Sequence, residues 1–138
     1  MTRTNPMTVE ELLLEQSKLQ AALNARGKAV NPAELTTVGC AVDYIVSMRD
    51  NLLMEVEEIL AVFPSTARKP WKTDHAVARS RALASLTDEE LQKLREESID
   101  ALLFLLNIVL ACSVDDTNVC ELLSKVYSKN KERIQSGY

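Results

Sequence analysis

The apolar residues of this chain recur with the period of α-helices. Between residues 38 and 63 they return every three or four positions, which matches the 3.6-residue helical turn. The pattern predicts five helical segments and no strand: residues 8–25, 31–63, 76–85, 87–112 and 113–135. Residues 64–75, rich in polar residues and proline, are expected to form a loop. The fold class expected is therefore an all-α helical bundle of about five helices.

Local signals indicate where these helices begin and end. Residues 8–11 and 87–90 have the Thr-x-x-Glu pattern of a capping box. Asn31 followed by Pro32 predicts the start of the second helix, and residues 113–116 predict the start of the last. Pro64 is expected to end the second helix because proline cannot continue the hydrogen-bonding ladder.

Composition agrees with one globular helical domain. The chain has 138 residues, of which 46% are hydrophobic, and a length of this order suits a single domain with one sizeable core. Only 3 glycines and 4 prolines occur, which favours helices over a turn-rich β fold. We therefore expect residues 1–138 to form one all-α domain.

Charge and hydropathy limit the partners and the compartment. The net charge of −4 gives no broad basic surface, so we do not expect the chain to bind a nucleic acid polymer. A small anionic ligand is not excluded, because local basic residues can bind one. The apolar run 99–112 is too short to cross a membrane and is expected to be a buried core helix. The N-terminus lacks the apolar segment of a secretory signal, and three cysteines are interpreted as buried thiols in a reducing cytoplasm.

Two acidic pairs indicate a metal site. Glu55 and Glu58 are three residues apart on one expected helix, and Glu97 and Asp100 have the same spacing on another. Residues at this spacing are neighbours on a helix surface, and carboxylates that converge repel one another unless a cation joins them. Their hard oxygen ligands suit Mg²⁺, with Mn²⁺ as an alternative. The competing interpretations are an ordinary solvated acidic face and acids placed at a helix N-terminus.

The second pair continues into a polar stripe on an otherwise apolar helix. At 100° per residue, Glu97, Asp100, Phe104 and Asn107 fall within about 80° of one another. Since a helix that is apolar on its other faces is expected to be buried, this stripe should face something polar inside the bundle.

Two further helices carry candidate substrate contacts. On the first helix, Gln20 and Asn24 lie with Gln16 on the face expected to be buried, and amides can read a nucleobase edge; the alternative is a hydrogen bond between helices. On the last helix, Asn130 and Arg133 continue the apolar stripe and Lys129 lies alongside it. These three residues suit phosphate capture, and the alternative is a frayed lysine-rich terminus.

The expected loop contains the single tryptophan and the single histidine. Trp71 beside Lys72 could stack on a base and contact phosphates, although a simple packing role is the alternative. His75 is expected to be solvated in the loop and receives no role.

Taken together, these motifs resemble the all-α nucleoside triphosphate pyrophosphohydrolase superfamily, which includes MazG-like enzymes and dimeric dUTPases. The resemblance is strongest to the dimeric dUTPases and their phage relatives, and it spans nearly the whole chain in the same order. The two acidic pairs match the family's ExxE…ExxD pattern. The chain departs from the family in two places: the stretch between the pairs is longer than usual, and Leu103 stands where the family has histidine. The resemblance implies that Gln20, Asn24, Trp71 and Phe104 hold the base.

The function expected is Mg²⁺-dependent hydrolysis of dUTP to dUMP and diphosphate. Glu55 is expected to orient or deprotonate the attacking water. Lys72, Lys129, Asn130 and Arg133 are expected to hold phosphates, and Asn107 to contact substrate. The resemblance also implies a homo-oligomer, a dimer or a tetramer. The alternatives are a MazG-like hydrolase of another substrate, dCTP or a purine dNTP, and a non-catalytic helical dimerisation module.

Overall fold

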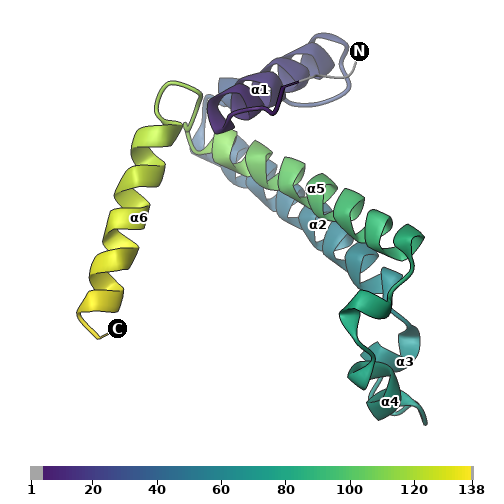
Figure 1. Cartoon of the computed structure of the whole chain (residues 1–138). Coiled ribbons are helices and arrows are strands. Elements are labelled where there is room, and N and C mark those ends of the chain that lie inside the picture. The colour runs from purple at the N-terminus through teal and green to yellow at the C-terminus, as the bar shows by residue number, and fades with distance from the viewer. Residues whose placement is uncertain (1–4, 138) are drawn as a thin grey trace. The chain divides into compact units, whose positions relative to one another are not determined.

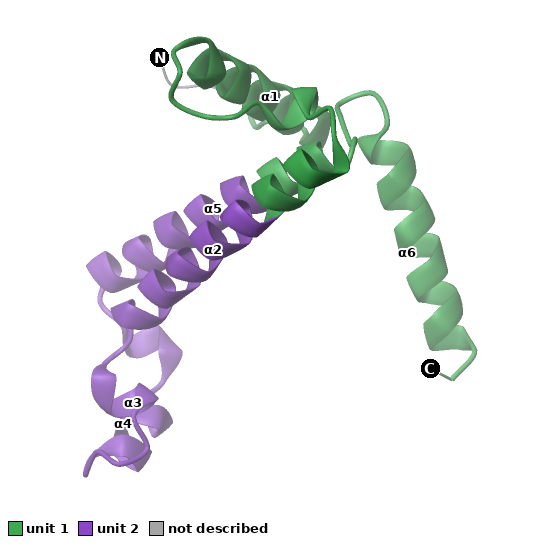
Figure 2. Ribbon diagram, turned by 180° about the vertical axis from the view of Figure 1, so that it is seen from behind, with its two compact units in different colours: residues 1–45, 106–138 green, residues 46–105 purple. Residues whose placement is uncertain are grey.

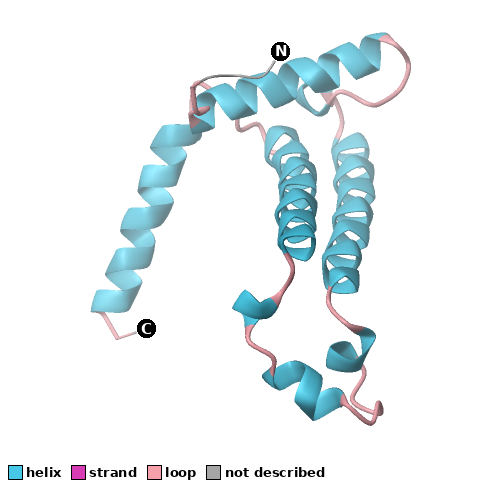
Figure 3. Cartoon of the chain, turned by 45° about the vertical axis from the view of Figure 1, so that its right-hand side comes forward, coloured by secondary structure: helices cyan, strands magenta, loops and turns pink. Residues whose placement is uncertain are grey.

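The computed structural model describes residues 5–137, and these form an all-α structure, as the sequence predicts. No strand occurs within this range (Figure 3). Four longer helices are α1 (Val9–Ala25), α2 (Val38–Val62), α5 (Asp88–Ala111) and α6 (Val119–Gln135) (Figure 1). The shorter elements are α3 (Ser65–Arg68), α4 (His75–Ser80) and the 3₁₀ turns η1 (Pro32–Glu34) and η2 (Leu83–Ser85).

Capping interactions set the starts of α1 and α5. At α5, the Thr87 N–H donates to Glu90 Oε1 (3.0 Å), and the Glu90 N–H donates to Thr87 Oγ1 (3.1 Å). This reciprocal pair is the capping box that the sequence predicts. At α1, the Glu11 N–H donates to Thr8 Oγ1 (3.2 Å). Both helix starts are therefore determined by residues close in sequence.

The predicted start of α2 is wrong. Asn31 caps only η1, where its side chain accepts a hydrogen bond from the Ala33 N–H (3.0 Å). The next residue after η1, Leu35, has an extended backbone, so the chain leaves the helical conformation. The α2 helix begins at Val38, and Thr37 Oγ1 accepts from the Cys40 N–H (3.0 Å).

The predicted start of α6 is also wrong, because a local turn occupies residues 113–118. Ser113 has a positive φ of 66°. The Asp115 side chain accepts hydrogen bonds from the Thr117 and Asn118 N–H groups at 2.8 and 3.2 Å. Such side-chain to backbone bonds compete with helix formation, and α6 starts only at Val119.

Two short helices interrupt the expected loop between α2 and α5. The α3 helix lies within residues 64–75, and α4 starts with His75. The two helices pack together, and His75 Nδ1 lies 2.7 Å from the Thr66 carbonyl oxygen. His75 is half-buried, so the expectation of a solvated histidine is wrong. It is instead part of the contact between α3 and α4.

The chain divides into two compact units, residues 1–45 with 106–138 and residues 46–105 (Figure 2). In the first unit, Leu13, Leu110 and Val119 form a buried apolar cluster, against which Leu106, Val109 and Val114 pack. This cluster joins α1, the end of α5 and the start of α6. It is much smaller than the sizeable core that the composition suggests. A single domain of residues 1–138 stays a prediction.

In the second unit, the adjacent stretches of α2 and α5 run side by side (Figure 2). Many of their apolar side chains remain exposed, including Met54 at 63% and Ile99 at 54%. The prediction that residues 99–112 form a buried core helix therefore fails at Ile99 and Leu105, which are exposed, whereas Leu110 near the end of this range belongs to the buried cluster of the first unit. Two adjacent helices cannot cover each other on every side, so a helix that is apolar all round keeps exposed faces.

The three cysteines differ from their expected environment. Cys40, Cys112 and Cys120 are all exposed, so their interpretation as buried thiols is wrong. They lie near helix ends, where a side chain has few neighbours. Among the described residues, no helix combines the length and apolar character that a membrane crossing requires.

Candidate metal and nucleotide site

Three of the four predicted acids come together in the second unit. Glu55 projects from α2, and Glu97 and Asp100 project from α5. One carboxylate oxygen from each lies within 4.8 Å of the others. The helical spacing of Glu97 and Asp100 places both on one face of α5, where they meet Glu55. The sequence predicted this convergence without knowing which helices are neighbours.

Glu55 has the most perturbed carboxyl group of the chain's described residues. Its side chain is half-buried, but Oε2 is shielded from solvent and has no hydrogen-bond partner. Burial is the largest cause that raises its pKa from 4.5 to about 7, followed by the charge of Glu58. A carboxyl group in this position favours the neutral form unless a positive charge is nearby.

Glu58 and Asp100 are the two solvent-exposed members of the acidic group. Both side chains are exposed, whereas Glu97 is half-buried. The pKa of Glu97 is raised, first by a hydrogen bond with Glu58 and then by burial. Glu58 thus acts on both Glu55 and Glu97, although its oxygens lie outside the tight group of three. Asp100 was expected to be buried in an apolar region, and its exposure corrects that expectation.

The donor set fits a hard divalent cation. Clustered carboxylates repel one another, and the shielded Glu55 Oε2 lacks the hydrogen bond that a buried polar atom requires. Oxygen-only donors suit Mg²⁺ or Mn²⁺. Glu55, Glu97 and Asp100 would bind the ion directly, with Glu58 beside them.

Buried amides gather in the first unit. Gln16 Nε2 donates to Asn107 Oδ1 over 2.8 Å, and both side chains are at most 6% exposed. Gln20, one turn further along α1, is 7% exposed. The predicted amide face of α1 is therefore buried at Gln16 and Gln20, and it contacts α5. Gln16 shows that the alternative interpretation, a hydrogen bond between helices, holds for at least one member of this stripe.

Asn24 behaves differently from the other amides. Its side chain is exposed, and Nδ2 donates to the Ala29 carbonyl oxygen over 3.0 Å. This bond holds the turn that follows α1, next to Gly27 with its positive φ of 68°. Its predicted base contact stays a prediction.

The remaining predicted substrate residues are distributed over both units. Trp71 and Lys72 are exposed in the turn between α3 and α4, with Trp71 at 77% exposure. Phe104 is half-buried on α5, one turn beyond Asp100. The phosphate candidates are exposed residues of α6: Lys129, Asn130 and Arg133. They belong to the first unit and the carboxylates to the second, so their meeting around one substrate stays a prediction.

Two features were missed at the level of sequence. The hydroxyl of Tyr44 is buried without a hydrogen-bond partner, and burial raises its pKa to about 12. Arg68, Arg79 and Arg81 contribute to the lining of a largely apolar cavity. The sequence signal for this cavity is the set of arginines at 68, 79 and 81 in a stretch otherwise rich in small residues.

The chain is similar to one phage enzyme along most of its length. It is 26% identical over 143 residues to a protein named dCTP pyrophosphatase from Enterobacteria phage T4, and the match covers 94% of this chain and 82% of that protein. No protein-family model and no solved structure matches the chain. The similarity supports a relationship with nucleoside triphosphate pyrophosphohydrolases, the group that the acidic pairs resemble.

Proposed function

We propose that this protein is a Mg²⁺-dependent pyrophosphohydrolase of a pyrimidine deoxynucleoside triphosphate. The observation that carries the proposal is the convergence of Glu55, Glu97 and Asp100, with the Glu55 Oε2 atom shielded and unpaired. A scaffold gains nothing from such an arrangement, because repulsion and burial both oppose it. The similarity to a phage dCTP pyrophosphatase supports the same reaction class.

The carboxylates have different tasks in this proposal. Bound Mg²⁺ supplies charge neutralisation for the phosphates and a more acidic water. Glu97 and Asp100 hold the ion, and Glu58 supports them. Glu55 also orients the attacking water or accepts its proton. Lys72, Lys129, Asn130 and Arg133 are proposed to hold the phosphates.

The base is proposed to be a pyrimidine, with two candidate substrates. The resemblance to dimeric dUTPases favours dUTP. The T4 relative, named for dCTP, supports dCTP at least as well. Side-chain amides present both donors and acceptors, so the buried Gln20 and Asn107 suit the edge of either pyrimidine.

A homo-oligomer is part of the proposal. Apolar side chains are exposed on both α2 and α6, among them Val38 at 82%, Tyr127 at 65% and Ile134 at 75%. Apolar helix faces of this kind are normally buried against other helices, and a second copy of the chain offers equivalent apolar faces. Sedimentation equilibrium is expected to give a dimer or tetramer; a monomer at micromolar concentration would contradict this part of the proposal.

A substrate panel tests the function. Purified protein is given dUTP, dCTP, dTTP, dATP and dGTP separately, with Mg²⁺ or with EDTA, and diphosphate release is measured. We expect Mg²⁺-dependent release with a clear preference for dUTP or dCTP. A preference for a purine dNTP would contradict the pyrimidine assignment. Absence of release with every dNTP would leave the helical dimerisation module as the better interpretation.

A further inference from the structure

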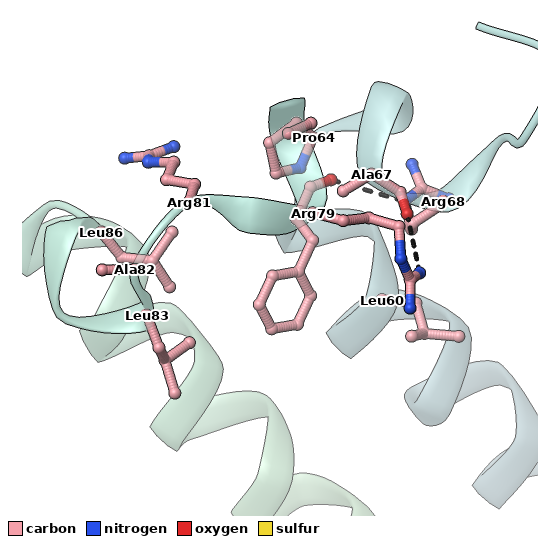
Figure 4. A pocket seen from close by; sticks show the side chains of 11 residues that line it. Leu60, Pro64, Ala67, Arg68, Arg79, Arg81, Ala82, Leu83 and Leu86 are labelled. Carbon is pink, nitrogen blue, oxygen red and sulfur yellow. Dashed lines mark hydrogen bonds between the residues drawn. The ribbon is translucent and has the colours of Figure 1, made fainter. Parts of the chain in front are cut away.

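A cavity in the second unit lies apart from the acidic group. It has a volume of about 320 Å³ and is formed by the end of α2 together with α3, α4 and η2 (Figure 4). No carboxylate lines it. Its size is at the lower end of the range of small-molecule sites, about 300–1,000 Å³.

The walls of the cavity are largely apolar. Leu60 lies near the end of α2 and Phe63 directly follows that helix, whereas Leu83 and Leu86 come from the segment that leads into α5. Leu86 is only 8% exposed, whereas Leu83 is 66% exposed, so the cavity has an open side at Leu83. These walls suit a ligand with an apolar or planar body.

Two arginines give the cavity a positive wall. Arg68 Nε donates to the Phe63 carbonyl oxygen (3.4 Å), and Arg79 Nη1 donates to the Ala67 carbonyl oxygen (3.3 Å). Both arginines lie on the same side of the cavity in Figure 4. A guanidinium has five N–H donors, and these bonds use one from each arginine. The remaining donors suit the oxygens of one phosphate group.

The third arginine is already committed to its own segment. Arg81 Nε donates to Ser85 Oγ (2.8 Å), and its Nη2 donates to the Ser85 carbonyl oxygen (2.9 Å). The same nitrogen lies 3.8 Å from Glu90 Oε1. Arg81 therefore fixes the η2 wall, and the anion-binding role falls to Arg68 and Arg79.

We propose that this cavity is a metal-independent binding site for a nucleoside monophosphate. A planar base can stack on the Phe63 ring or on a guanidinium plane, and the single phosphate pairs with Arg68 and Arg79. Inorganic phosphate would leave the apolar walls without a partner. A triphosphate carries charge that two guanidiniums do not neutralise. The ligand belongs to the same chemical class as the product of the proposed hydrolysis, but the inference does not depend on that reaction.

Calorimetric titration of the full chain in EDTA tests this site. In EDTA the acidic group lacks the metal with which it would hold phosphates. The cavity variants described below then distinguish binding at the cavity from metal-free binding at the proposed phosphate contacts Lys72, Lys129, Asn130 and Arg133. We expect saturable binding of a nucleoside monophosphate, with one site per chain. The matching nucleoside and inorganic phosphate should each bind at least about ten-fold more weakly, because each makes only half of the contacts. Absence of binding in EDTA would overturn the proposal.

Three variants and one control locate the binding. Arg68→Gln and Arg79→Gln should each weaken binding at least about ten-fold, since each removes a charge-assisted pair. Arg79 also links α4 to α3, so its replacement could weaken binding by disturbing the structure. Leu83→Glu avoids this problem, because it places a repelling carboxylate at the open side without removing a hydrogen bond. Arg49→Gln is the matched control, because Arg49 is an exposed α2 arginine that pairs with Asp50 outside the cavity. Unchanged affinity in all three cavity variants would refute the site.

Two further measurements distinguish this site from the acidic group and from a site for aliphatic anions. Asp100→Asn should keep the metal-free binding even though it is expected to lose hydrolysis, so the two proposals can fail independently. A long-chain carboxylate should not displace the nucleotide. If it displaces the nucleotide with higher affinity, the cavity binds aliphatic anions and the nucleotide assignment is wrong.

Discussion

Gln16 on α1 donates its side-chain amide to Asn107 Oδ1 on α5, over 2.8 Å and out of contact with water. This bond joins two residues 91 positions apart and fixes which atoms of the Asn107 amide face α1. Asn107 is a predicted substrate contact, so Gln16 is a positioning residue for it. A buried hydrogen bond of this kind stabilises the fold and also orients the amide.

Replacing Gln16 should therefore affect both stability and substrate affinity. Gln16→Leu removes the donor and leaves Asn107 Oδ1 without this partner, which is expected to cost about 1–3 kcal/mol in the free energy of unfolding. The KM for the preferred pyrimidine dNTP should rise, while kcat changes much less. Thermal unfolding and steady-state kinetics measure the two effects.

The control for this variant is Gln92→Leu. Gln92 is exposed on α5, and its Nε2 donates to Glu96 Oε1 over 3.1 Å. This substitution should change stability by less than about 0.5 kcal/mol and leave KM unchanged. If Gln16→Leu and Gln92→Leu behave alike, Gln16 does not position Asn107.

Loss of one carboxylate should abolish hydrolysis without unfolding the protein. Asp100→Asn keeps the size of the side chain but removes its charge, and the residue is exposed, so the fold should persist. Activity should fall at least about 100-fold, because even losing a residue that merely orients a metal ligand costs about 10–100-fold. Glu57→Gln is the control, since Glu57 is an exposed neighbour on α2 outside the acidic group. Equal activity in the two variants would remove Asp100 from the metal site.

The metal-free protein should become less stable as the pH rises from about 5 to 8. Glu55 has a pKa of about 7 in the folded chain and an ordinary value of 4.5. Between these values the unfolded chain has already lost the proton that the folded chain retains, so the free energy of unfolding falls. The raised pKa of Glu97 acts with the same sign. Above the pKa of the folded chain, Glu55 is ionised in both states, and the free energy of unfolding no longer falls because of this residue.

Thermal melts in EDTA across this pH range measure the effect. Glu55→Gln should flatten the decline, because a neutral amide does not titrate, and should make the metal-free protein more stable at the upper end of the range. Glu10, Glu90 and Asp115 have lowered pKa values and lose stability only at lower pH, so they do not contribute to this window. A wild-type Tm that rises between the two limits would contradict the environment assigned to Glu55.

The thiol of Cys120 should be less reactive than its exposure suggests. Its Sγ donates to Glu10 Oε1 over 2.6 Å, and this hydrogen bond is the largest cause of its raised pKa. Fewer thiolates at a given pH mean slower alkylation. Glu10→Gln should therefore speed iodoacetamide labelling of Cys120, as followed by mass spectrometry. Cys40, also exposed, serves as the internal control and should keep its rate. An unchanged Cys120 rate would show that Glu10 does not control the thiol.

Features that depend on neighbours in sequence were predicted well. The capping box at Thr87 and the shared face of Glu97 and Asp100 follow from spacings of one helical turn. The end of α2 before Pro64 follows from the hydrogen bond that proline cannot donate. Two helix starts were missed for a local reason that propensity does not reveal. At α6, the side chain of Asp115 bonds the backbone of a turn, and at α2 an extended residue follows η1.

Burial could not be predicted from the same patterns. The sequence shows that the helix around Ile99 is apolar on most sides, but not how many helices surround it, and here Ile99 stays 54% exposed. The arginine-lined cavity was missed because its walls come from α2, α3, α4 and η2 together. Their approach depends on contacts such as the one between His75 and Thr66.

The sequence by itself determined the all-α class and the two acidic pairs, because both are set by residues one helical turn apart. Only the tertiary structure decided that Glu55 meets Glu97 and Asp100 with one oxygen shielded, and that Gln16 bonds Asn107. The reason is physical: a helix fixes the direction of its own side chains, whereas the environment that shifts a pKa or orients an amide comes from a different helix.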